Sequence, residues 1–465
     1  MILYNIFLHP LRCFPGPVLF QATGLMKAGH MVSGNLQFKV KLFHDQYGPV
    51  VRIAPNELSF IEPQAWKDNY GHRTGGELPK HYSLYRLDQS APCNIISADQ
   101  EQHSILRRLL SHGFSERSMQ AQMPIIGGYV DLLMQRLRGN AADGTTVVDL
   151  NSWFNWVTFD IIGNLSFGSD FKNLGGADWH PWVRMSAKHN KLSAILASLR
   201  GIGLGVLVRW FVYSGLLPTQ TYLNYIEQQV RRRIDAGDQR PDFIEGLVQR
   251  KNDLSAHEIA ANAEALIGAG SESTATLLSG VVFSLLTHPK CLQKVIEEVR
   301  SQFRNEQEIT LTSVQRLDYM LACLNETFRY YPPVTNGMPR CTPKGGAVIC
   351  GRHVPEDTVV AIWQWAICHD PGLWTDPDGF HPERFLGHPK FADDRLDALQ
   401  PFSVGARNCI GRNLTYAEIR LILARLVYNF DLELCETSKD WIGVQKAYLV
   451  WDPPSLNVRL VPAVR

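Results

Sequence analysis

One loop constrains this chain more than any other feature, because it presents a single cysteine between two glycines directly before a helix. The loop reads FSVGARNCIG and runs from Phe402 to Gly411. Apolar residues then recur at helical spacing from Leu414 to Val427, so Cys409 is expected at the N-terminal end of an amphipathic helix. The helix dipole favours an anionic sulfur at that position, and the glycines leave room for a flat ligand to lie against the backbone.

Two interpretations of this cysteine compete. A cysteine without context is most often a buried structural residue. This loop, however, fits a pattern of five specified residues, which a chain of this length matches by chance with a probability on the order of 10⁻⁴. Arg407 also stands close enough to offer its charge to an acidic group on a bound ligand. The sequence therefore favours a thiolate that binds a metal. The five residues of the pattern are Phe402, Gly405, Arg407, Cys409 and Gly411.

The loop resembles the haem-binding loop of the cytochrome P450 family, the haem-thiolate monooxygenases. The segment Glu326-Thr327-Phe328-Arg329 resembles the Glu-x-x-Arg signature of that family, and Pro382-Glu383-Arg384-Phe385 resembles the segment that supplies a second arginine. Glu326 and Arg329 are spaced to share one helix face, although an isolated pair of this kind is usually exposed and contributes little. The resemblance implies that Glu326, Arg329 and Arg384 form a buried charge network with a structural role behind the haem.

A long helix is expected between Ser255, which opens a capping box with Glu258, and Pro289. It would have about thirty residues and a length of roughly 45 Å. Its middle contains Gly268 and Gly270, and glycines inside a helix need a reason. Either the helix packs closely against a neighbour there, or a distorted turn opens space for a ligand.

The resemblance favours the second interpretation. Ala269-Gly270-x-Glu272-Ser273 is similar to the oxygen-binding groove of the family, with Ser273 at the usual threonine position and Thr274 beside it. The resemblance thus implies that Glu272, Ser273 and Thr274 act in catalysis by helping to protonate bound dioxygen. A serine hydroxyl can relay a proton as threonine does, although its side chain is less restricted.

Other basic residues are expected at the haem propionates. His103 and Arg107 are one helical turn apart, where the family usually has Trp-x-x-x-Arg, so Arg107 fits better than His103. Arg340 is similar to the family's other propionate arginine. For each of them the alternative is a solvated surface charge. The implied cofactor is haem b with an axial cysteine thiolate; its expected contacts are Cys409 as the metal ligand and His103, Arg107, Arg340, Phe402, Gly405, Arg407 and Gly411.

The chain is expected to be mainly α with a small β-rich lobe, to which short strands at 347–350 and 358–362 belong. The resemblance implies the cytochrome P450 fold, with the haem between the long central helix and the cysteine-loop helix. The length of 465 residues would suggest about three domains, but no flexible linker or internal repeat divides the chain. Residues 21–465 are therefore predicted to form a single haem-thiolate monooxygenase domain, preceded at 1–20 by a short apolar segment and a proline-rich hinge.

Composition excludes several classes. The formal net charge of +1 argues against nucleic acid as a partner. The nine cysteines are scattered without a Cys-x-x-Cys pair, which argues against zinc sites and a disulfide framework and favours a reducing compartment.

The N-terminus suggests peripheral contact with a membrane. The apolar segment 1–11 is shorter than the about twenty residues that a span requires. Microsomal members of the family have a longer anchor before such a hinge, so this one resembles an incomplete anchor. The second apolar tract, 192–217, contains Arg200 and Arg209 and is interpreted as a core or membrane-dipping helical segment. The expected location is the cytosolic face of the endoplasmic reticulum membrane, with a soluble form as the alternative.

The resemblance implies a monooxygenase that inserts one oxygen atom from O2 into a lipophilic small molecule by hydroxylation or epoxidation. Its electrons would come from NADPH-cytochrome P450 reductase, or also from cytochrome b5. The segments expected to line the substrate site, 82–96, 192–213, 263–274 and 334–338, are largely apolar and carry no fixed charged anchor. This suits a terpenoid, polyketide or alkaloid intermediate, and the chain as a whole resembles fungal secondary-metabolite members.

Two alternatives stay open. One is a haem-thiolate isomerase or dehydratase that needs no reductase, against which the acid-alcohol pair Glu272-Ser273 counts. The other is a non-catalytic haem sensor, which would need neither a long oxygen-groove helix nor a large cavity.

Overall fold

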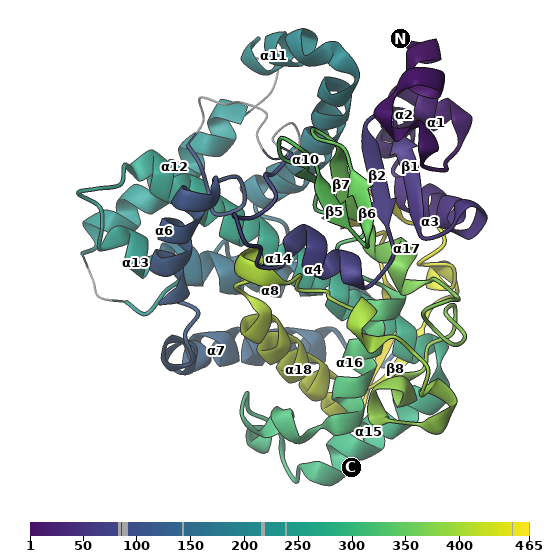
Figure 1. The fold of residues 1–465 in the computed structure, drawn as a ribbon. Helices are drawn as coiled ribbons and strands as arrows, with labels where there is room; N and C mark the ends of the chain where they lie inside the picture. The colour runs from purple at the N-terminus through teal and green to yellow at the C-terminus, as the bar shows by residue number, and fades with distance from the viewer. Residues whose placement is uncertain are drawn as a thin grey trace.

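The computed structural model describes residues 1–81, 85, 92–141, 144–214, 219–237, 240–448 and 450–464 (Figure 1). This part of the chain is mainly helical, and small sheets lie along one side of the helical mass. The predicted mainly α fold with a small β-rich lobe is confirmed. The α-helices are α1 Val18–Ala22, α2 Leu25–Ser33, α3 Leu36–Tyr47, α4 Gln64–Tyr70, α6 Gln100–Ser111, α7 Glu116–Asn140, α8 Leu150–Phe167, α9 Asn173–Gly176, α10 Pro181–Leu199, α11 Gly205–Tyr213, α12 Thr219–Asp235, α13 Glu245–Val248, α14 Ala256–Thr287, α15 Pro289–Gln302, α16 Asp318–Tyr330, α17 Gln364–Cys368 and α18 Arg412–Asn429.

The long helix α14 is the centre of the fold. Its capping box is formed as predicted, since the Ser255 hydroxyl accepts from the Glu258 N–H while the Glu258 carboxylate accepts from the Ser255 N–H. The helix ends just before Pro289, which opens α15. It contacts α8, α12, α15, α16 and α18, so a ligand bound beside its middle is reached from several elements.

The largest sheet has the strand order β1-β2-β7-β4. Strands β2 and β7 are parallel, whereas β1 pairs with β2 and β4 with β7 in antiparallel register. Strands β5 and β7 confirm the two predicted strands within a residue of their expected bounds. The strands are β1 Val50–Ala54, β2 Glu57–Phe60, β3 Val147–Asp149, β4 Arg340–Cys341, β5 Ala347–Ile349, β6 Arg352–Val354, β7 Val359–Ile362, β8 Phe430–Leu434, β9 Lys446–Ala447, β10 Trp451–Asp452 and β11 Asn457–Pro462.

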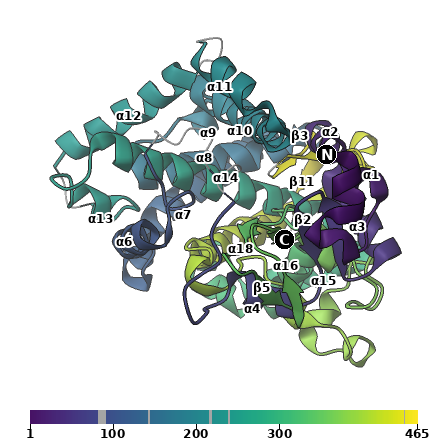
Figure 2. The same ribbon diagram turned by 45° about the horizontal axis from the view of Figure 1, so that its top comes forward.

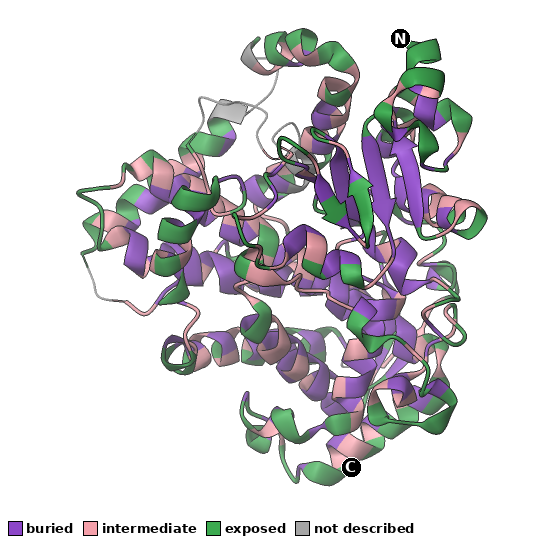
Figure 3. Cartoon of the chain, in the orientation of Figure 1, coloured by how far each residue is buried: buried purple, intermediate pink, exposed green. Residues whose placement is uncertain are grey.

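The buried apolar residues form two clusters, which Figure 3 shows as purple segments in the helical mass and in the sheet. The larger cluster joins α7, α8, α14, α16 and α18. The smaller one joins the N-terminal helices to β1, β2, β7 and α17. Both are built from alternating or helically spaced apolar residues whose burial is the main favourable contribution to folding.

The proline-rich N-terminal segment packs against the sheet. The Arg52 N–H donates to the Pro15 carbonyl oxygen at 2.7 Å, and a Cβ at Gly16 would lie 2.3 Å from the Arg52 carbonyl oxygen. Leu11 is fully buried in the smaller cluster. The backbone of this segment is therefore fixed to β1. The predicted boundary between an N-terminal segment, 1–20, and a single domain, 21–465, stays a prediction.

Two helical stretches in the described residues are long and apolar enough to cross a membrane by length and composition alone, 181–212 and 256–287. The second is α14, whose apolar window is 72% buried in the core. In the first, the helix is broken at Gly203, whose φ is 93°, and only 17% of the window is buried. Figure 2 shows α10, α11 and α12 above α14 and α8.

Candidate active site

The cysteine loop is held rigidly between a short 3₁₀ turn, Gly405–Arg407, and the start of α18. The Cys409 N–H donates to the Phe402 carbonyl oxygen at 2.8 Å, which closes the loop. The Phe402 ring lies 5.1 Å from the ring of Phe328 on α16 and 5.5 Å from that of Tyr416 on α18. Phe402 therefore anchors the loop to two helices.

The surrounding protein requires glycine at one of the two predicted positions, Gly405, but not at the other, Gly411. Gly405 has a φ of 77°, and a Cβ there would lie 2.0 Å from the carbonyl oxygen of Tyr70. Both its conformation and the close approach of α4 exclude a side chain. At Gly411 a Cβ would lie 3.9 Å from Cys409 Sγ, an ordinary contact. Gly411 thus leaves the space beside the sulfur open without being required by protein atoms.

The Cys409 side chain is exposed, although its surroundings are largely protein. Burial raises the pKa of the thiol, while the Gly411 N–H and the charge of Arg107 act in the opposite direction. The helix start, which the sequence predicted to favour the anion, is therefore outweighed by desolvation. A metal bound to the sulfur would remove the proton outright.

One cysteine cannot hold a metal ion alone. In the described ranges, no group of three or more His, Cys, Asp or Glu side chains could serve as a metal site. The other ligands of an iron at Cys409 would have to come from a prosthetic group, and a porphyrin supplies four nitrogens in a plane. The donor set therefore fits haem and not a bare ion.

A basic cluster lies beside this loop and consists of Lys80, Arg340 and Arg407. Lys80 and Arg340 are paired by an isolated β-bridge, and both are buried. Arg407 donates to both carboxylate oxygens of Glu77 at 2.8 Å from Nε, and to the Ala98 carbonyl oxygen at 2.8 Å. Arg340 lies over the ring of Tyr70, 5.3 Å from its centroid.

The charges of this cluster do not balance among the described residues named here. Burial together with the charges of Arg407 and Arg340 lowers the pKa of Lys80 to about 6, so its amine is mostly neutral near pH 7 without a partner. The two arginines then face one carboxylate, that of Glu77, which leaves one positive charge unmatched, and a protonated Lys80 would add a second. Haem b carries two propionates, which would pair with both. The cluster therefore fits the cofactor in its charge as well as its place.

His103 and Arg107 occupy different environments. His103 is buried, and burial together with Arg407 and Lys80 lowers its pKa to about 4, so it is neutral near pH 7. Arg107 donates to the side-chain oxygen of Asn408 at 2.7 Å and to its carbonyl oxygen. Arg107 thus supports the cysteine loop directly, and its role at a propionate stays a prediction.

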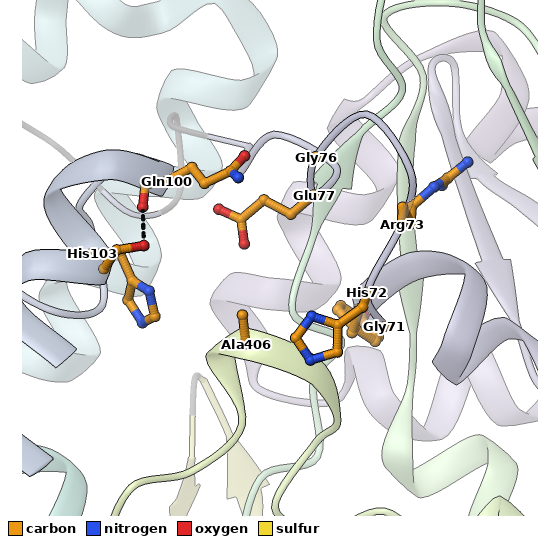
Figure 4. A pocket seen from close by; sticks show the side chains of 10 residues that line it. Gly71, His72, Arg73, Gly76, Glu77, Gln100, His103 and Ala406 are labelled. Carbon is orange, nitrogen blue, oxygen red and sulfur yellow. Dashed lines mark hydrogen bonds between the residues drawn. The ribbon is translucent and has the colours of Figure 1, made fainter. Parts of the chain in front are cut away.

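A small pocket of about 120 Å³ opens beside Glu77 (Figure 4). Glu77 points into the gap between Gln100 and His103 of α6 on one side and Ala406 of the cysteine loop on the other. The pocket is too small for a haem and large enough for a few water molecules. Its lining includes Glu77, the carboxylate that accepts hydrogen bonds from Arg407.

The middle of α14 differs from the predicted distorted turn. The helix is α-helical throughout Ala256–Thr287. A Cβ at Gly270 would lie 2.9 Å from Ile162 of α8, so this glycine serves close packing, which was the other interpretation. A Cβ at Gly268 would meet nothing within 4 Å, so open space lies beside that turn.

The three predicted catalytic residues are not brought together on one face. Ser273 is half-buried, and its hydroxyl donates to the Ala269 carbonyl oxygen at 2.6 Å. Ala269 is exposed, although it lies in the middle of the central helix, so accessible space adjoins this part of α14. Glu272 is half-buried, whereas Thr274 is 1% exposed and packs into the core. Glu272 and Ser273 thus keep accessible surface, and Thr274 does not.

The predicted charge network is formed. Glu326 accepts from Arg329 at 2.7 and 3.0 Å, and Arg384 Nε lies 3.3 Å from Glu326 Oε2. All three side chains are fully buried. Asp394 is a fourth member, because Arg384 also pairs with it, and the sequence did not predict this contact.

A larger cavity of about 840 Å³ lies between the N-terminal helices, the strands β1, β2 and β7, the end of α10 and the segment 336–339. Two of the predicted lining segments, 192–213 and 334–338, contribute to it. The predicted lining segment 82–96 lies partly outside the described residues.

Comparisons with known proteins agree with this site. The sequence model described as Cytochrome P450 matches residues 14–460. The chain is 62% identical to Cytochrome P450 monooxygenase 1 of Neocamarosporium betae, covering 100% of this chain and 96% of that one. It is 47% identical to Cytochrome P450 monooxygenase tpeC of Talaromyces stipitatus, covering 99% and 92%. It is 44% identical to the trichothecene C-15 hydroxylase of Fusarium sporotrichioides, covering 99% and 95%.

Proposed function

Since the chain belongs to the cytochrome P450 family and is a haem-thiolate monooxygenase of fungal secondary-metabolite type, we propose that Cys409 is its axial iron ligand and that the basic cluster binds the haem propionates. The single observation that carries this proposal is the exposed cysteine thiol, whose loop also contributes Arg407 to a cluster with more cationic side chains than carboxylates. The enzyme uses O2, a redox partner and a lipophilic small-molecule substrate.

Bound haem supplies the activation of dioxygen, and the thiolate favours O–O cleavage. The protein holds the cofactor by Cys409 and by charge pairing with Lys80, Arg340 and Arg407. We assign proton delivery to Ser273 and Glu272, because both keep accessible surface in the middle of α14, whereas Thr274 is buried. The Ser273 hydroxyl donates its hydrogen to the Ala269 carbonyl oxygen and can accept a hydrogen bond from water; to relay a proton, it must rotate away from that carbonyl.

Single substitutions at Ser273 and Thr274 test this assignment. Ser273→Ala should keep reductase-driven consumption of the nicotinamide while product falls and peroxide rises. Thr274→Val is the matched control, since it removes a hydroxyl of a residue that is buried on another face and should leave the ratio of product to peroxide unchanged. Equal coupling in the wild type and Ser273→Ala would remove the relay role.

The redox partner that we propose is NADPH-cytochrome P450 reductase, with cytochrome b5 as an additional donor. A relative 44% identical to this chain is named trichothecene C-15 hydroxylase, and by this likeness we propose a lipophilic terpenoid, polyketide or alkaloid intermediate as the substrate. The isomerase and sensor alternatives are not favoured, because the relatives named above are monooxygenases and a hydroxylase. Product formed without a reductase would favour the isomerase.

We also propose that the enzyme rests on the cytosolic face of the endoplasmic reticulum membrane through one apolar surface. Its members are at least 60% exposed, and the N-terminal segment and α11 lie on the same side of the molecule (Figure 1). Several large apolar side chains exposed on one side of a protein indicate an interaction site. The members are Met1, Leu3, Phe7, Leu8, Val206, Leu207 and Trp210.

Flotation with vesicles of phosphatidylcholine and phosphatidylserine tests this surface. Trp210→Glu should reduce the bound fraction, because a charge is placed where the indole would enter the interface. Leu396→Glu, at an exposed leucine on the short 3₁₀ helix Leu396–Ala398, is the control and should bind as the wild type does. Equal flotation of both variants would contradict the proposal.

A further inference from the structure

A carboxylate beside the cysteine loop binds the arginine of that loop. Glu77 accepts from Arg407 Nε with both carboxylate oxygens at 2.8 Å, and one of these oxygens also accepts from Nη2. The side chains of Arg407 and Glu77 are 7% and 20% exposed, so water screens the pair only in part. A bidentate, charge-assisted pair of this kind fixes the plane of the guanidinium. The proposed function uses Arg407 and gives Glu77 no role.

Two consecutive glycines present Glu77 to the cysteine loop. Gly75 and Gly76 both have a φ of 99°, in the region that residues with a side chain rarely adopt. A Cβ at Gly76 would also lie 3.0 Å from the side-chain oxygen of Gln100 on α6. From this turn the Glu77 side chain extends into the small pocket between α6 and Ala406, the neighbour of Arg407 in the loop (Figure 4). The backbone of the turn therefore sets where the carboxylate lies.

The pair with Glu77 leaves Arg407 able to bind a second anionic group. A guanidinium carries five N–H groups in a planar arrangement. Glu77 accepts from Nε and Nη2, and the Ala98 carbonyl oxygen accepts from Nη1 at 2.8 Å. These contacts use three of the five N–H groups, and each terminal nitrogen keeps one more. Arg407 can therefore hold Glu77 and a haem propionate at the same time.

Glu77 carries a negative charge near neutral pH. Burial favours its neutral form, but the hydrogen bond and charge of Arg407, together with the charge of Arg340, hold the pKa of Glu77 below its usual value. Arg407 precedes Cys409 by two residues in the same loop. A fixed negative charge thus lies in contact with the loop that carries the proposed iron ligand. A pair that only tied the segment at residue 77 to the loop would stabilise the fold without any effect on the iron.

We propose that Glu77 is a positioning residue that orients Arg407 toward a haem propionate and, by its charge, lowers the reduction potential of the haem iron. This inference rests on the proposed function, since it takes Cys409 as the iron ligand and Arg407 as a partner of a propionate. Reduction of the haem adds one electron, and a negative charge nearby disfavours that step, whereas Arg407 alone would favour it. Glu77 thereby sets how readily the enzyme accepts an electron from its redox partner.

Spectroelectrochemical titration of the haem-loaded, substrate-free enzyme tests the proposal, because it measures the reduction potential without turnover. Glu77→Gln removes the charge and keeps the size of the side chain. It should shift the equilibrium toward reduced haem by roughly threefold to tenfold, a rise of about 28–59 mV for a one-electron couple. Glu77→Asp keeps the charge and should stay closer to the wild-type potential than Glu77→Gln does. Gln100→Glu adds a second carboxylate to the facing wall of the same pocket and should lower the potential.

Glu101→Gln is the matched control, since it removes an exposed carboxylate of α6 and should keep the wild-type potential. If Glu77→Gln melted at a lower temperature but had the potential of Glu101→Gln, Glu77 would be merely structural and the proposal would be overturned. If Glu77→Gln lost its haem, Gln100→Glu would decide, and an unchanged or raised potential there would also overturn the proposal. The reduced carbon monoxide spectrum separates the two levels of the argument. With a normal thiolate spectrum only the role of Glu77 fails, and without it in the wild type the assignment of Cys409 fails.

Discussion

Replacement of Arg329 by alanine should destabilise the protein strongly, because the guanidinium is fully buried and makes five hydrogen bonds. Two go to Glu326, and three go to the carbonyl oxygens of Cys368, Pro377 and Gly379 at 2.6–3.0 Å. Alanine would remove the donor from these three carbonyl oxygens. Glu326 would then keep Arg384 as its remaining arginine partner. Removing one partner of a buried ion pair costs about 3–5 kcal/mol.

The melting temperature converts this cost into a measurable shift. Unfolding entropy of about 2.1 cal/mol/K per residue amounts to about 1 kcal/mol/K for a chain of this length. Arg329→Ala should therefore melt about 3–5 °C below the wild type in calorimetry, and it should retain less haem after purification. Arg329→Lys should fall between the two, since it keeps the charge but loses the planar fork.

The control is Arg395→Ala, which removes an arginine that is 53% exposed and pairs with the equally exposed Asp397. Surface pairs contribute about 0–1 kcal/mol, so this variant should melt within about 1 °C of the wild type. If Arg329→Ala had the melting temperature and haem content of Arg395→Ala, the buried network would not stabilise the scaffold, and the reasoning would be refuted.

Four further variants probe the haem site. Gly405→Ala should melt at a lower temperature and lose most of its haem, because its Cβ would overlap the Tyr70 carbonyl. Gly411→Ala should keep the wild-type melting temperature, and equal melting temperatures of the two variants would contradict the contact argument. Lys80 has a folded pKa of about 6 and an unfolded pKa of about 10.5, so between these values the unfolded state binds more protons and the haem-free protein gains stability as pH rises. Urea titrations from pH 6 to 10 should show a smaller gain in Lys80→Met, and parallel slopes would exclude this residue as the cause. Cys409→Ala should lack the strongly red-shifted Soret band in the reduced carbon monoxide spectrum, and retention of that band would move the axial ligand elsewhere.

Features that depend on neighbours in the sequence could be predicted. The capping box at Ser255 sets the start of α14, and the i,i+3 spacing of Glu326 and Arg329 sets the geometry of their pair. The cysteine loop was recognisable because its glycines and its position before a helix are local properties. In each case the physical cause lies within a few residues of the feature.

Contacts between distant segments could not be predicted in this way. Glu77 is 330 residues from Arg407, and a single glutamate before Lys80 carries no pattern that pairs it with the cysteine loop. Thr274 shows that neighbours in sequence can face different surroundings on a helix. It is adjacent to Ser273 in sequence, but one residue corresponds to about 100° of rotation, which turns Thr274 into the core.

The loop and the basic cluster together indicate that the fold is completed by its cofactor. Burial raises the pKa of the Cys409 thiol, and burial together with the charges of Arg407 and Arg340 lowers the pKa of Lys80, so the thiol stays protonated and the amine is mostly neutral near pH 7. A ligand that brings a metal to the sulfur and two carboxylates to the cations relieves both penalties at once. Because such a ligand binds the folded chain and not the unfolded one, each relieved penalty appears as added stability of the loaded enzyme. Weakening either end of the site should therefore weaken haem retention at the other end as well.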